Sequence, residues 1–113
     1  MSSSAEVRQH EAASYPVEIF IAGDVNDAVR ICREYCFEVG LCVTVTPTEY
    51  VYTAGAEAGV RIGLINYPRF PSEPAQLWGR AVALAELLIS GPFQSSATVQ
   101  ASDRTLWLTR RPE

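Results

Sequence analysis

The first hydrophobic segment after a polar N-terminal stretch, residues 17–22, is short and rich in β-branched residues. It predicts a strand, and because apolar residues occupy both alternating faces, we expect that strand near the centre of a sheet. Hydrophobic residues then recur every three or four positions between Asp24 and Gly40, which predicts a helix. Asp24 is placed to cap this helix, Asp27 adds an acid to its first turn, and Gly40 is placed to end it. The apolar stripe consists of Val25, Ala28, Val29, Cys32, Cys36 and Val39.

The middle of the chain has the period-two pattern of two paired strands. Residues 42–46 alternate, and the alternation resumes at residues 50–53 after Pro47. A proline inside a strand pattern predicts an edge strand or a bulge. Small residues at 54–59 indicate a hairpin loop, and residues 60–66 predict the returning strand near the sheet centre.

A second helix is predicted after a proline-containing turn. Residues 67–71 hold two prolines and cannot form a regular helix or ladder, whereas Ser72 is a candidate cap and Pro74 suits a first helical turn. Gly91 and Pro92 are expected to stop this helix. Its apolar positions are Leu77, Trp78, Ala81, Val82, Leu84, Ala85, Leu88 and Ile89.

The chain ends in a predicted hairpin, because residues 97–101 and 105–109 alternate on either side of a short turn. The order is therefore β-α-β-β-α-β with an extra C-terminal strand, which predicts an α+β fold, a two-layer ferredoxin-like sandwich. We expect one domain over residues 15–113 after a disordered tail over residues 1–14. Right-handed crossovers lead us to expect the first and third strands as parallel neighbours, with a barrel-like or swapped arrangement as the alternative.

Composition narrows the possible partners and location. Nine basic and thirteen acidic residues give a net charge of −4, which does not suggest binding to a nucleic acid backbone. No apolar run approaches the ~20 residues of a membrane span, so we expect no membrane contact. The polar N-terminus lacks the apolar core of a secretory signal. Three cysteines, an odd number, then indicate free thiols in a reducing compartment, and we expect a cytoplasmic protein.

The side-chain inventory excludes several kinds of catalysis. The chain has no lysine, so Schiff-base chemistry, a lysine general base and a P-loop lysine are excluded. The single histidine, His10, lies in the predicted tail, which disfavours a histidine-based triad or zinc site. We predict no cofactor and no metal, and we lean against an enzyme.

The expected parallel pairing of the first and third strands would bring both strand-to-helix turns to one end of the sheet. Two helix N-termini and an arginine would meet there, an arrangement that favours a small anionic ligand. The alternative is ordinary helix capping beside a rigid proline turn. The predicted ligand-binding residues are Asp24, Asp27, Asn66, Tyr67, Arg69 and Ser72.

Three cysteines form a second candidate site. Cys32 and Cys36 lie on the same helical face, and Cys42 opens the next strand. Three thiolates suit a soft metal, but the spacing matches no zinc-ribbon pattern and a fourth ligand is missing. Free cysteine is commonly a small buried hydrophobe, so we favour core packing.

The face of the sheet that the helices leave uncovered is a third candidate. Tyr50, Tyr52 and Trp107 lie on strand patterns, accompanied by threonines at similar alternating positions. Tyrosine and tryptophan are favoured in interface cores, which predicts a homo-oligomer that forms through this open face. An ordinary half-solvated sheet face is the alternative.

The segment from Cys42 to Tyr52, together with the preceding helix over residues 28–40, resembles the small trimeric CutA and PII-like proteins. Those proteins share the helix, the Cys-Val-opening strand, the following aromatic residues and the element order. The similarity covers about a third of the chain, and the histidine-proline-tyrosine segment of CutA is absent. The resemblance therefore implies an oligomer by analogy of fold and transfers no functional residue.

Three functions follow, in order of preference. The first is a self-associating binding or regulatory module without catalytic activity, motivated by the uncovered sheet face and the poor catalytic inventory. The second is a small enzyme in which Asp24, Asp27, Tyr67 and Arg69 enolise or isomerise a small anionic substrate. The third is a thiol or soft-metal site at the cysteines.

Overall fold

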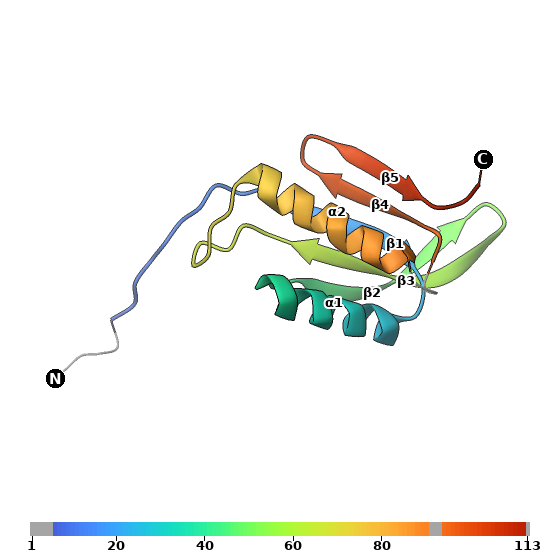
Figure 1. Ribbon diagram of the computed structural model, residues 1–113, viewed down its shortest axis with the longest axis horizontal. Coiled ribbons are helices and arrows are strands. Elements are labelled where there is room, and N and C mark those ends of the chain that lie inside the picture. Colours follow the sequence, from blue (N-terminus) through green and yellow to red (C-terminus); the bar gives the residue numbers. More distant parts are fainter. Residues whose placement is uncertain (1–5, 91–93, 113) are drawn as a thin grey trace.

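The computed structural model describes residues 6–90 and 94–112. This part of the chain is an α+β fold of five antiparallel strands and two helices, with both helices against one face of the sheet (Figure 1). The expected α+β class is confirmed. In chain order the elements are β1 (Val17–Ala22), α1 (Val25–Val39), β2 (Thr44–Tyr52), β3 (Gly55–Leu64), α2 (Pro74–Ser90), β4 (Ser96–Ala101) and β5 (Thr105–Thr109).

The β2–β3 hairpin is longer than the sequence predicts. Residues 54–59 were expected as a loop, but β3 already begins at Gly55, which pairs with Tyr52. The small residues of this segment continue the ladder instead of interrupting it. Pro47 lies within β2, which is an edge strand as expected, because an edge strand can lack one ladder donor.

The strand order is β2-β3-β1-β4-β5, and every neighbouring pair is antiparallel. The prediction that the first and third strands run parallel is wrong: Val17 lies opposite Leu64, and Ala22 lies opposite Gly59. The physical reason is the hairpin. The crossover through α1 makes β2 run in the same direction as β1. Because β3 turns back from β2 and inserts between β2 and β1, it runs against β1. The sheet is open, with β2 and β5 at its edges, so the barrel-like alternative is also wrong.

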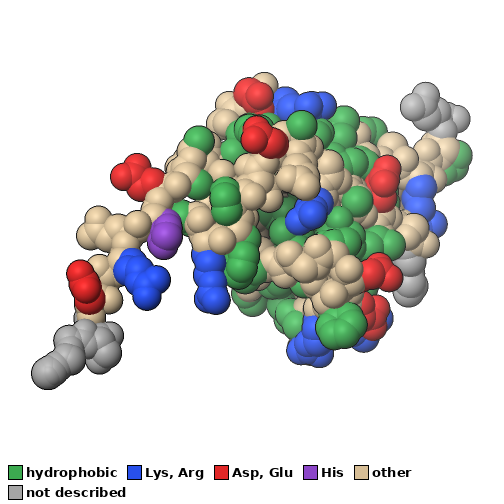
Figure 2. All heavy atoms as spheres, turned by 60° about the vertical axis from the view of Figure 1, so that its left-hand side comes forward, with side chains coloured by type: hydrophobic (Ala, Val, Ile, Leu, Met, Phe, Trp, Pro, Cys, Tyr) green, Lys and Arg blue, Asp and Glu red, His purple; other side chains and the backbone are tan. Residues whose placement is uncertain are grey.

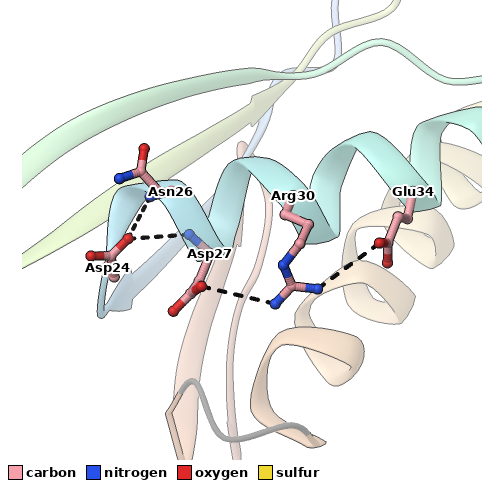
Figure 3. Close-up of polar contacts among 5 residues, drawn as sticks. All are labelled: Asp24, Asn26, Asp27, Arg30 and Glu34. Carbon is pink, nitrogen blue, oxygen red and sulfur yellow. Dashed lines mark hydrogen bonds and ion pairs between the residues drawn. The ribbon is translucent and has the colours of Figure 1, made fainter.

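Local hydrogen bonds define the start of α1, as expected. The Asp24 carboxylate accepts from the backbone N–H groups of Asn26 at 2.7 Å and Asp27 at 3.2 Å (Figure 3). Arg30 lies between Asp27 and Glu34 at 3.9 Å from each carboxylate. All these side chains are exposed, so the ion pairs contribute little to stability.

The C-terminal end of α1 depends on a glycine. Gly40 has a φ of 70°, in the left-handed region that favours glycine, and its N–H donates to the Cys36 carbonyl. The chain then turns directly into β2. This compact turn places Cys42 close to the end of the helix that carries Cys36.

The hydrophobic core lies between the sheet and the two helices. Alternate residues of the central strands face it, among them Ile19 and Ile62, which are fully buried. The α1 stripe is only partly correct: Ala28 and Cys32 are buried, whereas Val25, Val29, Cys36 and Val39 are half-buried. Tyr35, which the stripe omitted, is buried and its hydroxyl donates to the Arg80 carbonyl at 3.2 Å.

Residues 6–16 form no helix or strand, and two contacts attach the end of this segment to the body. The Tyr15 hydroxyl donates to Asp103 at 2.9 Å, and the Ala13 carbonyl accepts from the Asn66 amide at 2.8 Å. The expected helix stop at Gly91 and Pro92, and the first five residues of the predicted tail, lie outside the described residues. Over the described ranges, no helix is long and apolar enough to cross a membrane.

Candidate functional site

The six predicted site residues lie at two ends of the sheet. Asp24 and Asp27 follow the end of β1 that pairs with Gly59, whereas the turn after β3 lies at the end that pairs with Val17. The antiparallel pairing of β1 and β3 separates the two turns. The expected common pocket is therefore wrong.

Each predicted residue has a local role in its own turn. Asp24 caps α1, and Asp27 contacts Arg30 (Figure 3). In the other turn, Asn66 donates to the N-terminal segment and accepts from the Ser72 N–H at 2.8 Å. The Arg69 guanidinium lies 5.2 Å from the centre of the Phe70 ring. Ligand binding by these residues stays a prediction.

A cavity of about 640 Å³ opens between the C-terminal end of α1, the proline turn and the start of α2. Tyr67 and Ser72 line it, and they are the two of the six predicted residues that do so. Figure 2 turns this end of the molecule toward the viewer and shows hydrophobic side chains exposed between charged ones. Within the described part of the chain, the lining residues are Cys36, Gly40, Leu41, Cys42, Ile65, Tyr67, Phe70, Pro71, Ser72, Gln76, Leu77 and Arg80.

The cysteines differ in burial, and this decides their chemistry. Cys32 is buried, Cys36 is half-buried and Cys42 is exposed. Burial raises the pKa of Cys32 to about 12, and burial followed by the neighbouring Cys42 raises the pKa of Cys36. The described residues include no group of three potential ligands that could hold a metal ion. The three-thiol metal site is therefore unsupported, and Cys32 packs in the core.

Cys42 and Tyr67 contact each other at the wall of the cavity. The thiol donates to the Tyr67 oxygen at 3.5 Å. The contact with Cys42, and then partial burial, raises the pKa of Tyr67, so the phenol is protonated at neutral pH. Because its oxygen accepts from the thiol, the phenolic O–H remains able to donate to a bound molecule.

A second hollow, of about 230 Å³, lies at one end of the sheet and takes side chains from strands β1 to β5. Tyr50 on β2 lies directly opposite Glu57 on β3, and Trp107 on β5 lies opposite Thr98 on β4. Trp107 is 59% exposed. The described residues that line it are Phe20, Ile21, Ala22, Tyr50, Glu57, Gln94, Ser96, Ala97, Thr98, Trp107 and Arg111.

Tyr50 forms one wall of this hollow and lies close against the sheet backbone. Its hydroxyl donates to the Val60 carbonyl at 2.6 Å, and burial is the main cause that raises its pKa. A Cβ atom at Gly59 would lie 2.5 Å from the Tyr50 ring and 2.5 Å from the Ile21 carbonyl. Only glycine allows this approach of ring and backbone. The phenol is therefore fixed and neutral.

The charged groups around this hollow differ in whether they have partners. Glu18 is bound to Arg61 at 2.5 Å, and the Arg61 guanidinium lies 5.8 Å from the centre of the Phe20 ring. Arg111 donates through Nε to the Ser95 hydroxyl at 3.0 Å. Glu57 is exposed and has no ion-pair partner among residues 6–90 and 94–112. Its carboxylate can therefore receive a cation.

Sequence reasoning identified part of this hollow for a different reason. Tyr50 and Trp107 were recognised from strand alternation, but as contacts between copies of the chain. Glu57 was missed because residues 54–59 were interpreted as a loop. Glu57 could have been identified from the strand register, which places it opposite Tyr50. That register follows only if β3 is predicted to begin at Gly55.

No protein-family model and no curated protein matches the chain. Two solved structures share its fold. A phage SAM lyase in the apo state has a TM-score of 0.78 and 16% sequence identity, over 96% of this chain and 99% of the lyase. A phage SAM lyase in complex with S-methyl-5'-thioadenosine has a TM-score of 0.69 and 16% identity, over 93% of this chain and 96% of the lyase.

These structures contradict the preferred prediction of a module without catalytic activity, and the accompanying lean against an enzyme. Both neighbours that share the fold over nearly its whole length are structures of a lyase. The second-ranked prediction, an enzyme that acts on a small substrate, agrees with them better. At 16% identity, what is shared is the fold.

Proposed function

We propose that this chain is a lyase that cleaves S-adenosylmethionine (SAM), or a closely related sulfonium nucleoside, and releases S-methyl-5'-thioadenosine. The observation that carries the proposal is the TM-score of 0.78 to a phage SAM lyase over 96% of this chain and 99% of that chain. This coverage leaves out few residues of either chain, which supports a shared arrangement of the strands that line the hollow on the sheet.

The finer architecture belongs to the same proposal. We assign the fold as a ferredoxin-like sandwich with β5 as an added edge strand. The support is the order of the first four strands, in which β3 and β1 lie between β2 and β4 and the two helices share one face. We also keep a cytoplasmic location as a proposal, because three free cysteines suit a reducing compartment.

The hollow on the sheet has the groups that a sulfonium substrate requires. A cation is attracted to aromatic faces and to a carboxylate, which Tyr50, Trp107 and Glu57 supply. An amino acid carboxylate requires a cation, which Arg111 supplies. The larger cavity beside the helices is less suitable, because its one charged lining residue is Arg80, which repels a sulfonium.

The reaction requires little from the protein beyond binding and orientation. The substrate carboxylate attacks the side-chain carbon of the amino acid part that is bonded to the sulfonium sulfur, and a C–O bond forms. The C–S bond breaks, and its electron pair stays on sulfur as a neutral thioether. The products are S-methyl-5'-thioadenosine and the five-membered lactone of the amino acid. No proton leaves a substrate atom, so the route suits a chain without lysine and with one histidine far from the core.

The site is completed by a second copy of the chain in this proposal. The hollow, at about 230 Å³, is smaller than the roughly 300–1,000 Å³ of ordinary ligand pockets. The negative charge of the substrate carboxylate and the positive charge of the sulfonium both decrease on the way to the transition state. Exclusion of water therefore favours the reaction. We propose that the open sheet face, with Trp107 and Tyr52 exposed at 59% and 54%, associates with the same face of another copy.

The test is to incubate the purified full chain with SAM and measure S-methyl-5'-thioadenosine by liquid chromatography. We expect product formation above the spontaneous rate and a loss of at least about tenfold in Glu57→Gln. Glu49→Gln is the matched control, because Glu49 is an exposed glutamate of β2 outside the hollow. No product above the spontaneous rate, or an equal loss in both variants, would contradict the proposal.

A further inference from the structure

We propose a second ligand site, independent of the proposed lyase activity, in the cavity between the C-terminal end of α1 and the start of α2. The ligand class is a small monocarboxylate with an apolar or aromatic body. The cavity, at about 640 Å³, is within the usual range for small-molecule sites and is separate from the sheet hollow. It has no residue in common with that hollow.

The polar groups of the cavity are hydrogen-bond donors that converge on one volume. Arg80 is half-buried, and within the described part of the chain no carboxylate pairs with its guanidinium. Tyr67 accepts from Cys42 and keeps its own O–H for a ligand. The Ser72 hydroxyl and the Gln76 amide add donors from the start of α2. Among the described residues, the lining contains no aspartate or glutamate, so an anion meets no like charge from them.

The remaining wall is apolar and accessible. Leu41 and Leu77 form its inner part, and Ile65 and Phe70 form its rim, at 48% and 69% exposure. A side chain as large as Phe70 gains free energy when a ligand covers it. An apolar body against this wall therefore places its charged end toward Arg80 and the first turn of α2, where the helix dipole also favours negative charge.

The balance of groups selects a monocarboxylate over a phosphate ester or a nucleotide. One guanidinium neutralises a single negative charge, and a planar carboxylate matches its paired N–H groups. A dianion would leave a charge uncompensated beside Leu77 and Phe70. Most of the free energy of binding would come from the apolar body, and the arginine would set orientation and charge preference.

The experiment uses Cys42 as a built-in reporter, because its exposed thiol lines the cavity. Alkylation of Cys42 by iodoacetamide is followed by mass spectrometry while phenylacetate or indole-3-acetate is titrated. The uncharged phenylacetamide and indole-3-acetamide are the matched controls for the ligand. We expect saturable protection by the acids at concentrations at least about tenfold lower than by the amides.

Variants test whether Arg80 is the cause. Arg80→Gln should weaken protection by the acids about tenfold and leave protection by the amides unchanged, and Arg80→Lys should retain part of the preference. Arg30→Gln removes the same charge from an exposed site on α1 that lines neither this cavity nor the adjoining hollow that includes Cys42, and it should change nothing. Near-UV circular dichroism checks the fold of each variant. Equal protection by acid and amide in the unmodified chain, or no saturation, would overturn the proposal whatever the variants do.

The result is separable from the lyase assay. Arg80 lies outside the sheet hollow, so Arg80→Gln should retain the rate of SAM cleavage measured for the unmodified chain. If SAM is not cleaved but the acids protect Cys42, the second site stands alone. If SAM is cleaved and the acids give no selective protection, the second site is refuted and the proposed activity is unaffected.

Discussion

The two strand-to-helix turns both carry polar side chains but differ in what those polar groups bind. In the turn after β1, the Asp24 carboxylate satisfies two N–H groups of α1, and Asp27 meets Arg30. In the turn after β3, the Asn66 side chain accepts from the Ser72 N–H and donates to the Ala13 carbonyl of the N-terminal segment. Nearby side-chain donors line a cavity. The comparison teaches that a polar turn is a candidate site only where its side chains are left without partners.

The largest expected effect that tests this comparison is the difference in alkylation rate among the three cysteines. A thiol with a pKa of about 12 is ionised in about one molecule in 10,000 at pH 8. We expect Cys42, at the cavity, to be alkylated first, Cys36 more slowly, and Cys32 only after unfolding. Peptide mapping after timed alkylation measures this order.

The raised pKa of Cys32 also makes the free energy of unfolding depend on pH. The folded state holds the thiol proton more tightly than the unfolded state. The stabilisation from the buried, protonated thiol is therefore fully present below about pH 9. The free energy of unfolding should then fall as the pH rises from about 9 toward 12, with a smaller fall in Cys32→Ala. A fast reaction of Cys32 in the native protein would show that the helix does not bury it.

A second way to sharpen the comparison is to remove apolar side chains at the two ends of the sheet. Leu77 is 2% exposed and separates the cavity from the core, so Leu77→Ala should lower the free energy of unfolding by about 2–5 kcal/mol. Val25, at the start of α1, is half-buried, and Val25→Ala should have a smaller effect. Urea denaturation followed by circular dichroism measures both. Equal losses would show that the cavity wall is not part of the core.

The smallest expected effect tests the two helix starts directly. Asp24→Ala removes the cap of α1 and should lower the free energy of unfolding by about 1 kcal/mol. Ser72→Ala should change it by less than about 0.5 kcal/mol, because Ser72 uses its backbone N–H rather than its hydroxyl in the turn. The same denaturation assay applies. A larger loss for Ser72→Ala would reverse our account of which turn is satisfied internally.

Much of the local structure could be predicted, because it depends on local periodicity. The helix between Asp24 and Gly40 has the expected caps, and residues 17–22 and 105–109 form strands with the predicted bounds. The direction of β3 relative to β1 could not be read from either strand alone. It depends on a hairpin inserted between segments far apart in the chain, and this non-local feature determined where every predicted site residue lies.

The candidate site was less predictable than the fold for the same reason. Trp107 was identified by alternation within one strand, whereas Glu57 becomes a candidate site residue only because it lies opposite Tyr50 on the neighbouring strand. Arg80 has no signature in the sequence, since nothing in its helical pattern separates it from other exposed arginines. Only the packing of α1 against α2 shows that its guanidinium lines a cavity, with no carboxylate partner among residues 6–90 and 94–112.

The hydrogen atom that Gly59 carries in place of a side chain has a consequence for how this chain can vary. Any other residue there would push the Tyr50 ring outward or part β1 from β3, since both lie 2.5 Å from where its Cβ would stand. Position 59 therefore determines the shape of the hollow while supplying none of its chemistry. Among distant relatives that keep the ring in this place, we expect glycine at this position even where the groups around the hollow have changed.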